Sequence, residues 1–185
     1  MTLRHKTPLL VLLFILLTLA LFSSGCSTES KTENSSENSQ MESESQIQIA
    51  PLAPDFELED LSGKKIRLSS LRGKIVVLNF WSLGCKYCLQ EMPDFEEFNR
   101  SKPDDVAVLM VNLDRAESKL SDYINNQQFS FTVLKDEAAE TARTYMLRGV
   151  PTTFIVDKDG TIKARVDGAL TKEQLESLVA NVSQE

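Results

Sequence analysis

A chain of 185 residues with 42% hydrophobic and 25% charged residues has the balance of a globular protein, not of a protein with many membrane spans. Its net charge of -7 argues against nucleic acid as a partner. The one histidine, His5, falls in an N-terminal leader, so the mature chain has no imidazole for a catalytic triad, a Cys-His protease or a His-ligated metal site. Sulfur and carboxylate groups must carry any chemistry.

Residues 1–25 are predicted to be a secretion signal. A basic start leads into an apolar stretch at 9–22, which ends in Ser23-Ser24-Gly25 before Cys26. Fourteen helical residues span about 21 Å, less than the roughly 30 Å hydrocarbon core of a bilayer, so cleavage is favoured over an uncleaved anchor. The small residues before Cys26 resemble the lipobox of bacterial lipoproteins, which implies that Cys26 is acylated. The alternatives, a plain exported protein and a retained anchor, also place the domain outside the cytoplasm.

The segment 26–50 is rich in Ser, Glu, Asn and Gln and nearly free of apolar residues until its end. Such a composition cannot bury enough surface to offset the entropy of ordering. We expect a disordered tether, lipidated at Cys26, that holds a domain of residues 51–185 away from the lipid surface.

The domain is predicted to begin with a short β-hairpin, with strands at 56–58 and 65–68 joined by Leu61-Ser62-Gly63. The next run, 75–81, is apolar and β-branched except for Asn79. Strands that are buried on both faces of a parallel sheet have this composition, so 75–81 is the predicted central strand.

Helices and strands are predicted to alternate after the central strand. Apolar residues recur at every third position from Leu89 to Phe98, which predicts an amphipathic helix over 85–100. Asp157-Lys158-Asp159-Gly160 predicts a hairpin turn. The pattern indicates an α/β fold, with a mixed central sheet flanked by helices on both faces. The remaining predicted elements are strands at 106–113, 131–134, 152–156 and 162–166 and helices at 119–126, 137–145 and 172–182.

Cys85 and Cys88 form the motif with chemical meaning. The order strand, loop, helix places Cys85 at a helix N-terminus, where unpaired N–H groups and the helix dipole favour a thiolate, and Lys86 adds a positive charge. Cys85 is the predicted nucleophile and Cys88 the resolving thiol of a disulfide exchange. Two alternatives stay open: half of a zinc site, for which the mature chain offers no second ligand pair, and a purely structural disulfide.

Four stretches resemble the membrane-anchored thioredoxin-like proteins of the ResA/TlpA type: Leu78-Asn79-Phe80-Trp81, the Cys85 to Cys88 pair, Glu91-Met92-Pro93, and Gly149-Val150-Pro151-Thr152-Thr153-Phe154. The resemblance covers residues 51–182. It implies a thioredoxin-like fold with an N-terminal β-hairpin extension. It also implies a cis Pro151 that faces the disulfide, and a Val150 whose backbone groups pair with an extended substrate.

Glu91 lies three residues after Cys88 and therefore on the same helical face. In the family that the chain resembles, the matching glutamate tunes the active-site thiols, which implies a general acid-base role towards Cys88. The alternative is a solvated surface carboxylate. Asn79 stands where ordinary thioredoxins carry a buried aspartate, which makes Glu91 the natural substitute.

The resemblance implies a thiol-disulfide oxidoreductase that acts as a reductant in an oxidising compartment. A membrane thiol-disulfide transporter would supply its electrons, and exported proteins with disulfides, apocytochrome c foremost, would be its substrates. We expect a monomer with no metal and no cofactor beyond the redox-active disulfide. Alternatives are a reductant for an exported methionine sulfoxide reductase, an oxidant, and a redox-silent adaptor or metal carrier. A peroxiredoxin is disfavoured because the Pro-x-x-x-Thr-x-x-Cys pattern is absent around Cys85.

Overall fold

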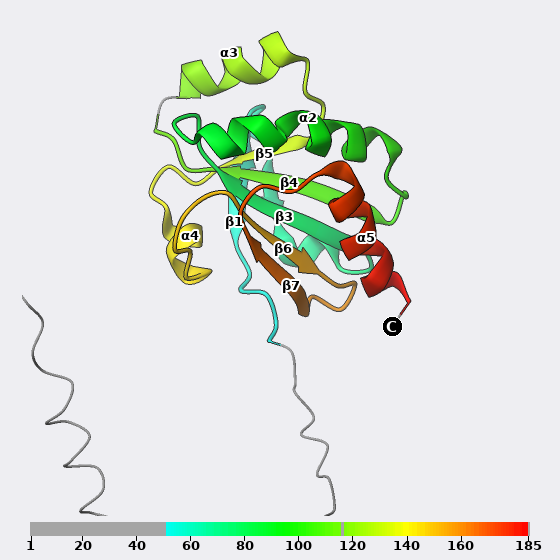
Figure 1. Ribbon diagram of the computed structural model, residues 1–185. Coiled ribbons are helices and arrows are strands. Elements are labelled where there is room, and N and C mark those ends of the chain that lie inside the picture. The colour runs from blue at the N-terminus through cyan, green and yellow to red at the C-terminus, as the bar shows by residue number, and fades with distance from the viewer. Residues whose placement is uncertain (1–50, 116, 185) are drawn as a thin grey trace, which may run out of the picture. The chain divides into compact units, whose positions relative to one another are not determined.

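The computed structural model describes residues 51–115 and 117–184 (Figure 1). The predicted signal peptide (1–25), the acylation site Cys26 and the tether (26–50) lie outside the described residues. The elements are β1 (Glu57–Asp60), β2 (Lys65–Arg67), the 3-10 helix η1 (Leu68–Leu71), β3 (Ile75–Trp81), α2 (Lys86–Ser101), β4 (Val106–Asn112), α3 (Glu117–Gln127), β5 (Thr132–Lys135), α4 (Glu140–Thr144), β6 (Thr152–Val156), β7 (Ile162–Asp167) and α5 (Lys172–Ser183).

All of these strands form one mixed sheet in the order β2-β1-β5-β4-β3-β6-β7. The inner strands β3, β4 and β5 are parallel, whereas β6 runs antiparallel to β3 and β7 antiparallel to β6. The predicted N-terminal hairpin is present, and it joins the same sheet because β1 pairs with β5. The mixed sheet and the hairpin extension are therefore confirmed.

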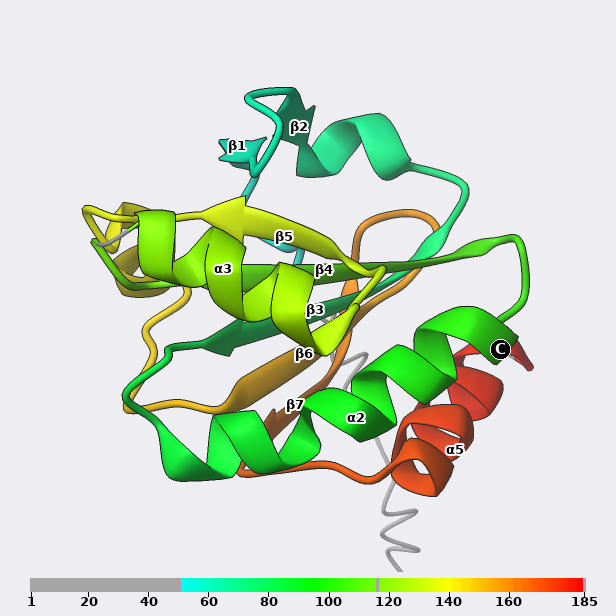
Figure 2. The ribbon, with the colours of Figure 1, turned by 90° about the horizontal axis from the view of Figure 1, so that it is seen from above.

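Helices cover both faces of the sheet, as predicted (Figures 1 and 2). Apolar residues of α2, α3 and α5 share one core with the sheet, and those of η1 and α4 share the other. The helix α2 contributes a stripe of side chains that are at most 2% exposed: Cys88, Met92, Phe95 and Phe98. Burying side chains of this size contributes about 1.5–3 kcal/mol each, so this stripe firmly attaches α2 to the sheet.

The strand β3 is buried along its whole length. Successive side chains of a strand point to opposite faces. Val77 and Trp81 accordingly belong to the core under α2, and Leu78 and Phe80 to the opposite core. By the same alternation Asn79 points towards α2, so the one polar side chain of β3 enters an apolar layer.

The helix predicted over 137–145 is wrong in its extent, because α4 covers only Glu140–Thr144. Asp136 directly follows β5, and its carboxylate accepts hydrogen bonds from the N–H groups of the first turn of α4. Its Oδ1 accepts hydrogen bonds from Glu140 N at 2.9 Å and Thr141 N at 3.3 Å, and its Oδ2 accepts one from Ala142 N at 2.9 Å. Ala139 has a φ of 52°, in the left-handed region, so the backbone turns there and becomes helical only afterwards.

The Asp136 contacts predict a measurable contribution to stability. Replacing Asp136 with Ala leaves three backbone N–H groups without this acceptor, and we expect the free energy of unfolding in urea to fall by about 1–3 kcal/mol. Asp136→Asn retains one acceptor oxygen and should lose less. Glu137→Ala, at the exposed neighbouring position, is the control and should stay close to the wild type. Equal stability of the three variants would contradict this role of Asp136.

Candidate active site

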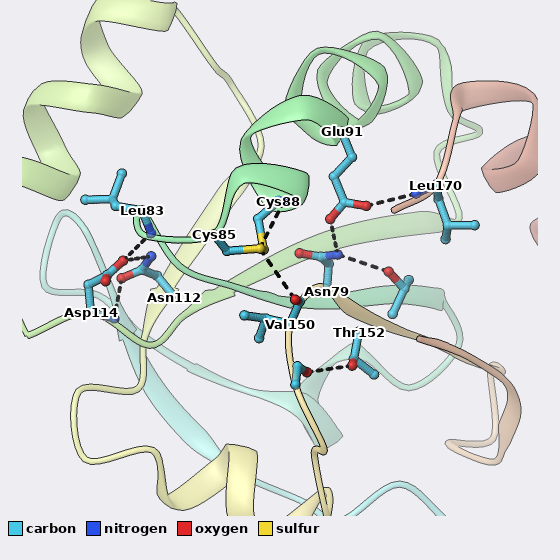
Figure 3. The surroundings of a disulfide bond; sticks show 12 residues. Asn79, Leu83, Cys85, Cys88, Glu91, Asn112, Asp114, Val150, Thr152 and Leu170 are labelled. Atoms are coloured by element: carbon cyan, nitrogen blue, oxygen red, sulfur yellow. Dashed lines mark hydrogen bonds between the residues drawn. A yellow bond between two sulfur atoms is a disulfide. The ribbon is translucent and has the colours of Figure 1, made fainter. Parts of the chain in front are cut away.

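The two cysteines lie where the chain leaves the carboxyl end of β3 and enters α2 (Figure 3). The connecting loop is fastened to the end of β4, because Leu83 N donates to Asp114 Oδ2 at 2.6 Å. Asn112 Nδ2 donates to the same oxygen at 2.9 Å. These side chains fix the position of the loop that precedes Cys85. Sequence reasoning missed Asn112 and Asp114, although a polar residue at the end of a buried strand is a visible signal.

Cys85 and Cys88 form a disulfide with a Cα–Cα distance of 5.2 Å. Cys85 is the N-cap of α2, and its Sγ accepts a hydrogen bond from Cys88 N at 3.1 Å. The predicted place of Cys85 at a helix N-terminus is therefore confirmed. The two sulfurs differ in access: Cys88 is 0% exposed, whereas Cys85 is partly exposed. A partner molecule can reach Cys85 and not Cys88.

The segment before β6 lies against the disulfide. The peptide bond between Val150 and Pro151 is cis, as the resemblance implied. The Sγ of Cys85, which carries no hydrogen while the disulfide is closed, is 3.4 Å from the carbonyl oxygen of Val150, a distance at which the S–H group of the reduced thiol can donate a hydrogen bond. The fold thus brings Val150 and Pro151 to the disulfide from 65 residues away in the chain.

Glu91 is 2% exposed, so it is not a solvated surface carboxylate. Its Oε1 accepts a hydrogen bond from Asn79 Nδ2 and its Oε2 one from Leu170 N, both at 2.9 Å. Asn79 Nδ2 also donates to Thr153 Oγ1 at 3.0 Å. A buried carboxyl group with two donors is thus held on the inner face of α2, one helical turn beyond Cys88.

Burial raises the pKa of Glu91 from its usual value of 4.5 to about 7. The hydrogen bonds from Leu170 and Asn79 oppose this rise, because they favour the carboxylate, while the negative charge of Asp94 adds to it. A group with a pKa near neutrality can exchange a proton under physiological conditions.

Glu91 and Cys88 lie on the same helical face, as the spacing predicted, but no hydrogen bond joins them in the described part of the chain. The Oδ1 atom of Asn79 is buried and has no hydrogen-bond partner there. In Figure 3 this oxygen points away from Glu91, to the side on which the disulfide lies. Sequence reasoning named Asn79 but not its contacts with Glu91 and Thr153, because these residues meet only across the sheet.

Comparison with known proteins shows matches over most of the domain. Residues 49–165 match the model of the AhpC/TSA family. The thiol-disulfide oxidoreductase ResA of Bacillus cereus is 36% identical over 141 residues, which cover 76% of this chain and 82% of ResA.

Solved structures agree with the sequence matches. StoA from Bacillus subtilis has a TM-score of 0.63 and 26% identity, over 69% of this chain and 98% of StoA. The exposed lipoprotein thioredoxin of Streptococcus pneumoniae has a TM-score of 0.62 and 31% identity, over 69% of this chain and 99% of that protein. These similarities confirm the thioredoxin-like fold that the resemblance implied.

The raised pKa of Glu91 predicts how stability depends on pH. The native state binds this proton more tightly than the unfolded chain, so the stabilising contribution is complete below about pH 4.5 and is lost as the pH rises through about 7. The difference between 4.5 and about 7 corresponds to about 3 kcal/mol. Glu91→Gln cannot ionise, so its stability relative to the wild type should increase by about that amount between pH 5 and pH 8.

Urea unfolding of the oxidised protein at several pH values measures this effect, because disulfide-bonded cysteines do not titrate. Glu97→Gln, on the exposed face of α2, leaves Glu91 in place and should keep the wild-type pH dependence. If the free energies of unfolding of the wild type and of Glu91→Gln changed with pH in parallel, the pKa of Glu91 in the folded protein would be close to its usual value, which would contradict the prediction.

Proposed function

The chain belongs to the AhpC/TSA family and is a thiol-disulfide oxidoreductase, and we propose that it works outside the cytoplasm as a reductant of disulfides in exported proteins. The observation that carries the disulfide-exchange chemistry of this proposal is the unequal access of the two sulfurs. The partly exposed Cys85 lies at the N-terminus of α2, and the buried Cys88 lies one turn further along.

In the reduced pair, Cys85 is the nucleophile. The N–H group of Cys88 and the positive end of the helix dipole stabilise its thiolate. The thiolate attacks one sulfur of a substrate disulfide, forms a mixed disulfide and releases the other substrate sulfur as a thiolate. Cys88 then attacks Cys85 Sγ, which closes the protein disulfide and releases the second substrate thiol. Two electrons pass from the protein to the substrate, and no further cofactor is needed.

Cys88 must lose its proton before this second step, and we assign that proton to Glu91. Support comes from the burial of Glu91, its position on the inner face of α2 and a pKa of about 7. A carboxyl group that is half ionised near neutral pH can accept a proton from a thiol and return it to a substrate thiolate. The buried Oδ1 of Asn79 supplies an acceptor beside this path.

Val150 and Pro151 are the proposed substrate-binding residues. The carbonyl of Val150 lies beside Cys85 Sγ, and its peptide groups join no strand in the described part of the chain. An extended substrate segment can therefore pair with the backbone of Val150 and present its sulfur to Cys85.

The proposed location is the outer side of the cell membrane, with Cys26 acylated after removal of residues 1–25. The basic and apolar leader before Cys26 supports this location. A second support is the solved relative from Streptococcus pneumoniae, an exposed lipoprotein thioredoxin. Among the described residues, no helix has the length and apolar character needed to cross a membrane.

The proposed direction of electron flow is from a membrane thiol-disulfide transporter, through this protein, to exported substrates. By the family resemblance, the foremost substrate is apocytochrome c, whose haem-attachment cysteines must be reduced before haem is joined to them.

Cysteine variants test the order of the two steps. With dithiothreitol as electron source, the full-length protein should reduce a peptide disulfide, and Cys85→Ser should lose this activity down to uncatalysed exchange. When it is pre-reduced and mixed with the peptide in the absence of dithiothreitol, Cys88→Ser should instead accumulate a mixed disulfide with the peptide, visible by mass spectrometry and released when dithiothreitol is added. Cys26→Ser changes the third cysteine and should keep turnover. A stable mixed disulfide on Cys88 in Cys85→Ser would reverse the assignment.

The reduction potential of the Cys85–Cys88 pair tests the proposed direction of electron flow. Equilibration of the full-length protein with glutathione or dithiothreitol, with Cys88→Ala as control, should give a potential near or below about -270 mV, the value of thioredoxin. A potential near about -120 mV, typical of a strong oxidant, would contradict the reductant role. Absence of a reversible two-electron couple would contradict disulfide exchange itself.

A further inference from the structure

The surface beside the disulfide differs in charge from the domain as a whole. Residues 51–185 carry 17 Lys and Arg against 22 Asp and Glu. The stretch 141–151, from the first turn of α4 to Pro151, nevertheless carries Arg143 and Arg148, both exposed, and no acidic residue, although Glu140 at the start of α4 is acidic and exposed. An acidic domain thus presents positive charge next to its reactive sulfur.

Two hollows meet on this surface. One has a volume of about 510 Å³ and is lined by Tyr87, by residues 148–152 and by residues 167–169. The other has a volume of about 310 Å³ and is lined mainly by Leu113, Ala139, Ala142 and Leu147. Both include Arg148, Gly149 and Val150, so the two hollows adjoin at the segment whose Val150 carbonyl lies beside Cys85, and together they are called the trough below.

The lining of the trough suits an extended peptide. Tyr87 is 63% exposed, and an aromatic side chain left so open beside a reactive group is typical of a binding surface. The aliphatic side chains of the second hollow provide a further apolar contact. Val150, where the two hollows meet, places the middle of a bound segment next to Cys85.

The carboxylate that lines the trough offsets only part of the charge of the arginines. Arg148 has no ion-pair partner among the described residues, and the contact that the structure gives Arg143 is to the Ala138 carbonyl at 2.8 Å. The acid that lines the trough, Asp167, is 3.1 Å from Arg165 Nε and also accepts a hydrogen bond from Thr152 Oγ1 at 3.0 Å. The positive charge of Arg148 also acts on Asp167. Three arginines, Arg143, Arg148 and Arg165, thus stand against one carboxylate, which leaves a net positive charge in and beside the trough.

From this juxtaposition, and on the basis of the proposed function, we infer that the trough formed by Tyr87, Leu147, Arg148 and Val150 binds an extended segment whose disulfide-bonded cysteine is flanked by acidic side chains. The apolar walls contact the segment, Val150 aligns its backbone and the arginines attract its carboxylates. Substrates of this class would be preferred over neutral or basic ones with the same disulfide.

Three synthetic peptides test the inference. They share one sequence and carry a single cysteine in a mixed disulfide with a fluorescent thiol, flanked on both sides by Glu, Gln or Lys. The reduced full-length protein attacks the peptide sulfur, releases the fluorescent thiol, and ends as the Cys85–Cys88 disulfide with a free peptide thiol. Excess dithiothreitol supplies the two electrons for each further turnover, and its uncatalysed rate with each peptide is subtracted.

We expect kcat/KM for the Glu peptide to exceed that for the Gln peptide by about fivefold at low ionic strength, and that for the Lys peptide to be lower still. High salt should reduce the preference. Arg148→Gln should bring the ratio of Glu to Gln peptide rates close to one. Lys64→Gln removes the same charge from the exposed β1–β2 turn, at the other edge of the sheet, and should keep the wild-type ratio.

Equal rates for the Glu and Gln peptides in the wild type would overturn the inference and leave the proposed function intact. The inference would also be overturned if Arg148→Gln lowered kcat/KM by the same factor for all three peptides and left the ratio of Glu to Gln peptide rates unchanged. Arg148 would then act on the thiols and not on the substrate. Failure of the wild type to reduce any peptide, or a small uncharged disulfide, would contradict the proposed function itself.

Discussion

The position of the disulfide depends on the burial of β3 on both faces. With every residue of Ile75–Trp81 buried, the strand cannot slide or tilt without exposing apolar surface on one side or the other. The chain must leave the sheet after Trp81, and α2 begins a few residues later with its own buried stripe against the same strands. Cys85 is thereby held at the meeting point of a fixed strand end and a fixed helix N-terminus.

The same buried layer explains the behaviour of Glu91. A carboxylate in an apolar core is costly unless it is hydrogen-bonded, and the structure provides two donors, one from β3 and one from the segment before α5. These donors only partly compensate for desolvation, so the group stays near its point of half ionisation at neutral pH. Asn79, whose Nδ2 donates to Glu91 Oε1, is therefore a positioning residue for this carboxyl group.

The active site divides into a buried and an exposed half. Cys88, Glu91 and Asn79 are shielded from solvent, where proton affinities can be shifted. Cys85 and Val150 are at the surface, where a substrate can approach. The trough extends along this surface from Val150, away from the sulfur of Cys85. In the proposed cycle, substrate choice and proton transfer are thus carried out by different residues, and the two can change independently.

Features contained in contiguous residues could be predicted from the sequence. The central strand, the amphipathic spacing of α2 and the order strand, loop, helix around Cys85 each depend on neighbouring positions, as does the shared helical face of Cys88 and Glu91. The alternation of elements predicted the α/β class, but the thioredoxin-like topology and the cis Pro151 were predictable only through resemblance to a family. X-Pro bonds are seldom cis, so the sequence around Pro151 does not by itself indicate one.

Only the tertiary structure decided what surrounds these residues. Leu170 is 79 positions from Glu91 in the chain, and Val150 is 65 positions from Cys85. The helix α4 is short because the Asp136 carboxylate binds the N–H groups of its first turn, a contact that the spacing of apolar residues in the sequence does not indicate. Periodicity specifies which side of an element is apolar, but burial of a carboxyl group, its donors and the path of a surface trough arise only when distant segments pack together, so they cannot be deduced from local sequence.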